Sequence, residues 1–77
     1  MDSTHMSSHH YKGYTIELTL DMEGIMWTCQ YIIVKAGEKK AGGFPDGNTF
    51  ASPERAEFAA LEKAKSLIDN SEIDKNP

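Results

Sequence analysis

The stretch from Ser52 to Asn70 constrains the fold most, because it predicts one amphipathic helix. Ser52 is suited to cap the first turn through its hydroxyl, and Pro53 is suited to the first helical position, where a missing amide hydrogen costs nothing. Asn70 is a candidate left-handed residue at the end of the helix. At about 100° per residue, one face of the helix carries small and aliphatic side chains. These are Ala56, Ala60, Ala64, Leu67 and Ile68.

The residues before the helix predict the sheet that it covers. From Tyr14 to Asp21, apolar and polar side chains alternate, which is typical of a strand with one buried face and one wet face. Ile25 to Lys35 is rich in aromatic and β-branched residues and predicts a second strand, and a short third strand is predicted near Lys40 to Phe44. We therefore predict an α+β fold in which a three-stranded antiparallel sheet is covered on one face by a single C-terminal helix, in the order β-β-β-α.

Two features of this arrangement predict a contact surface. Phe58 projects into the charged face of the helix, away from the alanines. In the second strand, Trp27, Cys29, Tyr31 and Ile33 share one face, but the opposite face is also partly apolar. The N-terminal tail, a second copy of the chain and a ligand are all candidates to cover that opposite face. The predicted interaction surface consists of Phe58, Met26, Ile32 and Val34.

Both ends of the chain are predicted to lie outside the folded domain. Residues 1–10 show no hydrophobic pattern and predict a disordered tail. The His5-Met6 pair resembles a cloning scar, which would make Met6 the natural start. Residues 71–77 form a polar segment that we expect to be frayed, so the single domain is predicted to span 11–70.

Composition narrows the classes of function. The 77 residues allow one small domain, which buries only roughly 60% of its unfolded surface and would gain stability by dimerising. The formal charge of −4 argues against non-specific binding to nucleic acid or to an anionic membrane. No apolar run has the length of a membrane span or of a signal peptide core. The single cysteine excludes an internal disulfide and favours a reducing, cytoplasmic location.

No combination of residues predicts an enzyme, a metal site or a cofactor site. Cys29 lies in the middle of a strand on its more apolar face, where a thiol is usually inert. The carboxylate pairs Glu54/Glu57 and Asp21/Glu23 are typical of a solvated surface, and no Cys/His cluster has the spacing of a zinc site. The histidines all fall in the predicted tail, at His5, His9 and His10. We therefore predict a non-enzymatic protein without catalytic, cofactor-binding or metal-binding residues.

Four lysines indicate nucleic-acid binding as an alternative function. A nucleic-acid patch would need Lys12, Lys35, Lys39 and Lys40 to gather at one end of the sheet. The Lys39-Lys40 pair is also typical of a solvated hairpin tip.

Short stretches resemble known proteins. Tyr11 to Ile16 and Phe50 to Ala56 resemble small proteobacterial proteins that combine a β-sheet with one helix. The alanine face resembles the last helix of double-stranded RNA-binding domains, although the lysines of that family are replaced here by Pro53, Glu54 and Glu57. The start of the predicted helix, from Ser52 onward, is similar to that of HicB-like antitoxins. We predict an interaction or self-association module with an unknown protein partner or itself; the resemblances imply RNA binding or an antitoxin role as alternatives.

Overall fold

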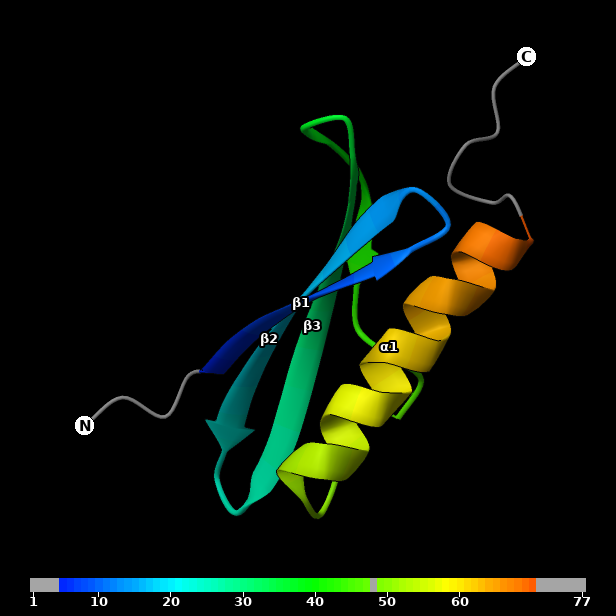
Figure 1. Cartoon of the computed structure of the whole chain (residues 1–77). Helices are drawn as coiled ribbons and strands as arrows, with labels where there is room; N and C mark the ends of the chain where they lie inside the picture. The colour runs from blue at the N-terminus through cyan, green and yellow to red at the C-terminus, as the bar shows by residue number, and fades with distance from the viewer. Residues whose placement is uncertain (1–4, 48, 71–77) are drawn as a thin grey trace.

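Four antiparallel strands followed by one helix form the fold (Figure 1). The computed structural model describes residues 5–47 and 49–70. The elements are β1 (His5–Tyr11), β2 (Tyr14–Glu23), β3 (Met26–Lys35), β4 (Glu38–Gly43) and α1 (Pro53–Asp69). Each strand pairs with the next one along the chain, so the sheet is an antiparallel meander in the order β1-β2-β3-β4. The predicted α+β class, with an antiparallel sheet before one C-terminal helix, is confirmed.

The sheet has four strands rather than the predicted three, because residues assigned to a tail form β1. The prediction of disorder is therefore wrong for residues 5–10. The turn after β1 explains the pairing: Lys12 and Gly13 have φ values of 48° and 84°, and a type I′ turn requires both to be positive. Such a turn matches the twist of paired strands, so it allows the polar strand β1 to pair with β2, which follows it. The remaining parts of the predicted tails, residues 1–4 and 71–77, lie outside the described residues.

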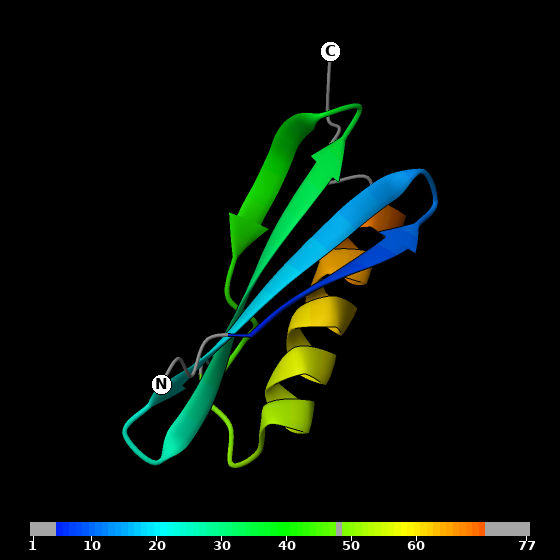
Figure 2. The same cartoon turned by 60° about the vertical axis from the view of Figure 1, so that its left-hand side comes forward.

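The core lies between α1 and the two middle strands (Figure 2). Alternate residues of β2 and β3 turn toward the helix, as the sequence predicts, and the residues between them turn to the outer face of the sheet. The sheet contributes seven buried side chains, Tyr14, Ile16, Leu18, Leu20, Cys29, Tyr31 and Ile33. The outer face of β3 is half-buried rather than fully exposed along most of its length.

The helix begins and ends close to the predicted residues. Ser52 is the N-cap, and its hydroxyl accepts a hydrogen bond from the Arg55 backbone N–H at 3.3 Å. Asn70 ends the helix, but its φ of −91° shows that the predicted left-handed conformation is wrong. Its backbone N–H donates to the Ser66 carbonyl at 2.9 Å, which closes the last turn without a left-handed residue. Within the described chain, α1 is not long and apolar enough to cross a membrane.

Small side chains set the distance between α1 and the sheet. Ala56, Ala60 and Ala64 are fully buried, so their face of the helix lies directly on β2 and β3. Ile68 completes the buried stripe, whereas Leu67 is only partly buried and packs at its margin. The predicted apolar face is thus confirmed, with Leu67 nearer its edge than the sequence suggests.

The segment between the sheet and the helix is tied to β3. Phe50 and Trp27 exchange two backbone hydrogen bonds, of 2.7 and 2.8 Å, which continue the pairing beyond β4. β4 itself begins earlier than the predicted Lys40. At Gly43 an added Cβ would lie 3.2 Å from the Tyr31 hydroxyl, so the absence of a side chain allows this close approach. These contacts fix where the first turn of α1 starts.

Candidate functional site

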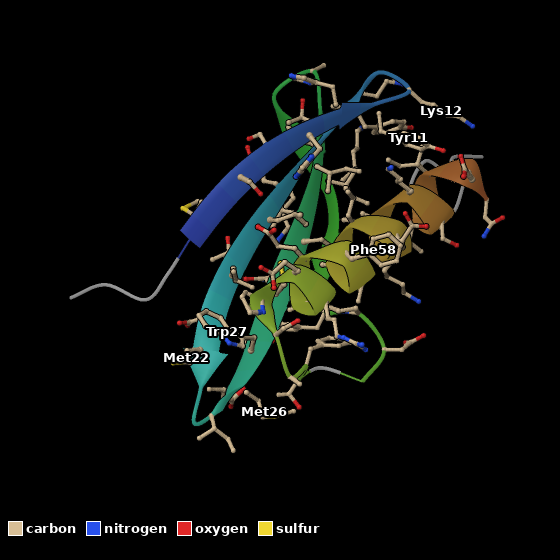
Figure 3. The ribbon with its side chains drawn as sticks, turned by 60° about the horizontal axis from the view of Figure 1, so that its bottom comes forward. Tyr11, Lys12, Met22, Met26, Trp27 and Phe58 are labelled. Atoms are coloured by element: carbon tan, nitrogen blue, oxygen red, sulfur yellow. The ribbon has the colours of Figure 1, made fainter. Side chains whose placement is uncertain are left out.

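The predicted interaction surface is divided between two sides of the molecule. Phe58 lies on the outside of α1 with 65% of its surface exposed (Figure 3). Ile32 and Val34 lie on the outer face of the sheet, because their neighbour Ile33 is buried beneath α1. Met26 shares that outer face at the start of β3. The structure therefore places Ile32 and Val34 side by side and puts Met26 on the same face at the other end of β3, while Phe58 lies on the opposite side of the sheet, on α1.

The four lysines of the predicted nucleic-acid patch do lie at one end of the sheet. The β1–β2 and β3–β4 turns that carry them are at the same end of the meander (Figure 1). Two of these lysines have carboxylate partners: Lys12 Nζ lies 2.8 Å from Asp69 Oδ1, and Lys40 Nζ lies 3.2 Å from Glu38 Oε1. Their charge is partly neutralised within the chain, which weakens the case for a phosphate-binding surface.

A groove separates β1 from the N-terminal half of α1. It has a volume of about 210 Å³ and is lined by His9, Leu18, Glu54, Glu57, Phe58 and Leu61. The groove forms because α1 lies across β2 and β3 and leaves β1 beside it. Since His9 pairs with Ile16, its side chain turns to the same face of the sheet as the buried residues of β2.

The lining combines an apolar floor with negative charge. Leu18 lies at the bottom and is 1% exposed, Leu61 is half-buried on the helix, and the Phe58 ring is exposed. Glu54 and Glu57 add two carboxylates, and neither has a cationic partner within the described residues. Such a groove can hold an apolar side chain and can attract a positive charge beside it.

The groove lies next to an edge of the sheet. β1 is the first strand in the sheet order and, within the described chain, it pairs with β2 alone. An edge strand presents a row of backbone N–H and C=O groups that have no strand partner. β1 contains no proline and no lysine, and its register with β2 runs from His5 to Tyr11 without a bulge. Three devices that protect an edge from pairing, namely proline, lysine and a bulge, are therefore absent from β1 itself.

A polar cluster joins the β1–β2 turn to the last turn of α1. The Tyr11 hydroxyl donates to both oxygens of Asp69, at 2.9 and 3.0 Å, and Lys12 Nζ donates to Asp69 Oδ1 at 2.8 Å. Lys65 Nζ lies 5.2 Å from the centre of the Tyr11 ring. The hydrogen bond from Lys12 is the main cause of a lowered pKa for Asp69, and the bond to Asp69 raises the pKa of Tyr11. This cluster holds β1 and α1 together at one end.

Replacing Asp69 with asparagine is expected to reduce stability near neutral pH and to have little effect in acid. A carboxyl with a lowered pKa in the folded protein contributes stability above its unfolded pKa, and that contribution is lost as the pH falls through the folded pKa. The difference in Tm between the wild type and Asp69→Asn should therefore shrink as the pH is lowered from about 7 to about 2. Thermal unfolding followed by circular dichroism measures it.

Glu62→Gln is the control, because Glu62 is an exposed carboxylate of the same helix without an ion pair in the described chain. The Tm difference between Glu62→Gln and the wild type should not shrink as the pH is lowered. A Tm difference for Asp69→Asn that stays constant across the pH range would contradict the role given to the cluster.

The remaining reactive side chains do not gather into a reaction centre among the described residues. Cys29 is fully buried, and burial, together with the negative charge of Glu57, raises the pKa of its thiol to about 11. The thiol is therefore protonated at neutral pH and shielded from solvent. His9 and His10 lie in β1 and not in a tail, on opposite faces of the strand, and their shortest hydrogen bonds are 3.4 Å contacts to Ser7 and Thr15. No group of three potential metal ligands occurs in this described region.

Comparison with protein-family models, curated proteins and solved structures gave no match. The resemblances to RNA-binding domains and to HicB-like antitoxins therefore stay predictions. The case for a function rests on the groove and on the strand edge beside it.

Proposed function

We propose that this protein is a non-enzymatic interaction module that holds an extended segment of a partner protein along β1, in the groove beside α1. The observation that carries the proposal is an apolar groove beside β1, an edge strand that pairs with β2 alone among the residues the structure describes. A segment that adds to the edge gains backbone hydrogen bonds, while every second side chain turns toward the groove. The backbone hydrogen bonds at the edge of β1 then supply affinity, and the groove supplies selectivity.

The apolar part of the site needs an apolar anchor from the partner. A side chain of leucine size that covers Leu18 and Leu61 would also contact the exposed ring of Phe58. Burying a side chain of this kind contributes about 1.5–3 kcal/mol. The exposure of Phe58 in the free protein is explained if this ring contacts the bound segment.

A second copy of the chain is a poorer occupant of the groove than a different protein. If two copies paired β1 with β1, the side chains offered toward the helix side would be those of Ser7 and His9. Both are polar and neither would fill the apolar floor. Tyr11, the one aromatic residue of β1, is already bonded to Asp69. Self-association through this edge therefore remains the competing outcome of the test.

Phe58→Ser is expected to weaken binding of an extended peptide with a central leucine by tenfold or more, since about 1.4 kcal/mol of lost contact corresponds to a factor of ten. A suitable probe is the capped, uncharged peptide Thr-Gln-Thr-Leu-Thr-Gln-Thr. Its binding is measured by titration against the ¹⁵N-labelled protein, with shifts expected at the amides of β1 and of the groove. The circular dichroism spectrum of the variant should stay that of the wild type, because Phe58 is exposed.

Phe44→Ser is the matched control, because it makes the same change at another exposed phenylalanine, which does not line the groove. It should leave peptide affinity unchanged, and a peptide with serine in place of its leucine should bind far more weakly. The proposal fails if the wild type does not bind the leucine peptide at millimolar concentration. It also fails if sedimentation shows a dimer that the peptide does not dissociate.

A further inference from the structure

We infer that the segment bound in this groove carries a lysine or arginine two residues away from its apolar anchor, and that Glu57 and Glu54 select it. The inference rests on the proposed function and names the chemistry of the partner. It follows from the charge of the groove and from the spacing of the carboxylates along α1.

The carboxylates of the groove are available to a ligand. The described ion pairs involve Asp69, Glu38 and Asp46, and none of them involves Glu54 or Glu57. Glu57 is half-buried beside the groove and Glu54 is exposed at the start of the helix. An apolar segment without a positive charge would bring neutral atoms close to Glu57 and remove some of its water without compensation. A cationic side chain avoids that cost.

The spacing of the groove residues defines where the cation belongs. Glu57 precedes Leu61 by one helical turn, which is a distance of about 6 Å along the axis at 1.5 Å per residue. Residues two apart in a strand project to the same face and are separated by about 6.7 Å. When the anchor lies against Leu61, the side chain two residues away therefore lies opposite Glu57. Glu54 is about 10 Å from Leu61 along the helix, within reach of a long lysine or arginine side chain.

The charges at the C-terminal end of α1 balance one another, unlike those of the groove. The polar cluster there contains Lys12 and Lys65, both close to the Tyr11 ring. Asp69 offsets Lys12 at 2.8 Å, and Glu62 lies in the same region as Lys65, so the unbalanced negative charge of α1 lies beside Glu54 and Glu57. The position of the cation relative to the anchor therefore sets the register in which a segment adds to β1.

Charged versions of the same probe peptide test the inference. In Thr-Lys-Thr-Leu-Thr-Lys-Thr a lysine lies two residues from the leucine on each side, so the test does not depend on the direction of the added strand. An exposed ion pair contributes up to about a fivefold change in affinity. The wild type should bind this peptide about fivefold more tightly than the version with glutamate in place of lysine. The difference should shrink at about 1 M salt, where charges are screened within about 3 Å.

Glu57→Lys should abolish or reverse the preference between the two charged peptides. Glu23→Lys is the matched control, because it makes the same change of net charge. Glu23 pairs with Met26 and lies on the outer face of the sheet, away from the groove. It should leave the preference within a factor of two of the wild type.

The outcomes separate the two proposals. Equal affinity of the wild type for both charged peptides, or an unchanged preference in Glu57→Lys, would overturn the inference about charge. If the uncharged peptide still bound in a Phe58-dependent manner, the proposed function would stand. Failure of every peptide to bind would overturn both.

Discussion

Replacing Ile33 with alanine is expected to lower the free energy of unfolding by about 2–5 kcal/mol. Ile33 is fully buried, and it lies on β3 between Ile16 of β2 and Ala41 of β4. The substitution leaves a cavity at the centre of the core, where the surrounding strands and α1 cannot close around it. A domain of 77 residues has a total stability of only about 4–12 kcal/mol, so the loss is a large fraction of it.

The effect is measured by urea unfolding, followed through the fluorescence of Trp27, the one tryptophan of the chain. In a domain of this size, each kcal/mol lowers Tm by about 4–8 °C, so a fall of at least about 8 °C is expected. Ile32→Ala is the control, because it removes the same atoms from the half-buried neighbour on the outer face. It should cost about 1 kcal/mol or less. Equal costs at both positions would contradict the burial of one face of β3.

The helix and the two middle strands could be predicted because each carries a periodic pattern. Ala56, Ala60 and Ala64 recur at the spacing of one helical face, and all three are buried. In β2 the alternation of apolar and polar residues reports directly on which side chains turn to the core. In these segments the burial of apolar side chains determines the conformation. The apolar residues therefore recur in the sequence with the period of a helix or of a strand.

β1 could not be predicted from the same signal, because its pairing does not depend on a buried face. Most of its residues are polar, and α1 lies mainly on β2 and β3, although Tyr11 at the end of β1 contacts Asp69. This strand is held by the ladder of backbone hydrogen bonds to β2, by the turn at Lys12 and Gly13, and by the hydrogen bonds from Tyr11 to Asp69. The signal that was present is the glycine in the second position of a two-residue turn between Tyr11 and Tyr14, which is typical of a hairpin.

The groove depends on this missed strand, so most of its lining was not predicted as a site. Phe58 and Glu57 break the apolar pattern of the helix, and both prove to line the groove. Their neighbours across the groove, His9 and Leu18, come from strands that only the fold brings beside α1. A sequence pattern can indicate an exposed aromatic residue, but it does not show which element lies opposite it.

Ala60→Leu is expected to destabilise the domain by about 1–3 kcal/mol, the usual cost of extra atoms in a filled core. Ala60 is fully buried in the middle of the stripe that lies on β2 and β3. Intrinsic helix propensity hardly differs between the two residues, so the cost reports on the space between helix and sheet. Because α1 forms one wall of the groove, lifting it should also weaken binding of the leucine peptide.

Ala59→Leu provides the control within the same turn of α1. Ala59 is half-buried at the side of the buried stripe, where a longer side chain can extend toward solvent. Its free energy of unfolding should stay within about 0.5 kcal/mol of that of the wild type. If Ala60→Leu were equally harmless, α1 would not rest closely on the sheet. The groove would then owe its shape to the Tyr11–Asp69 cluster alone, and Asp69→Asn, rather than a change in the alanine stripe, would be the substitution that weakens peptide binding.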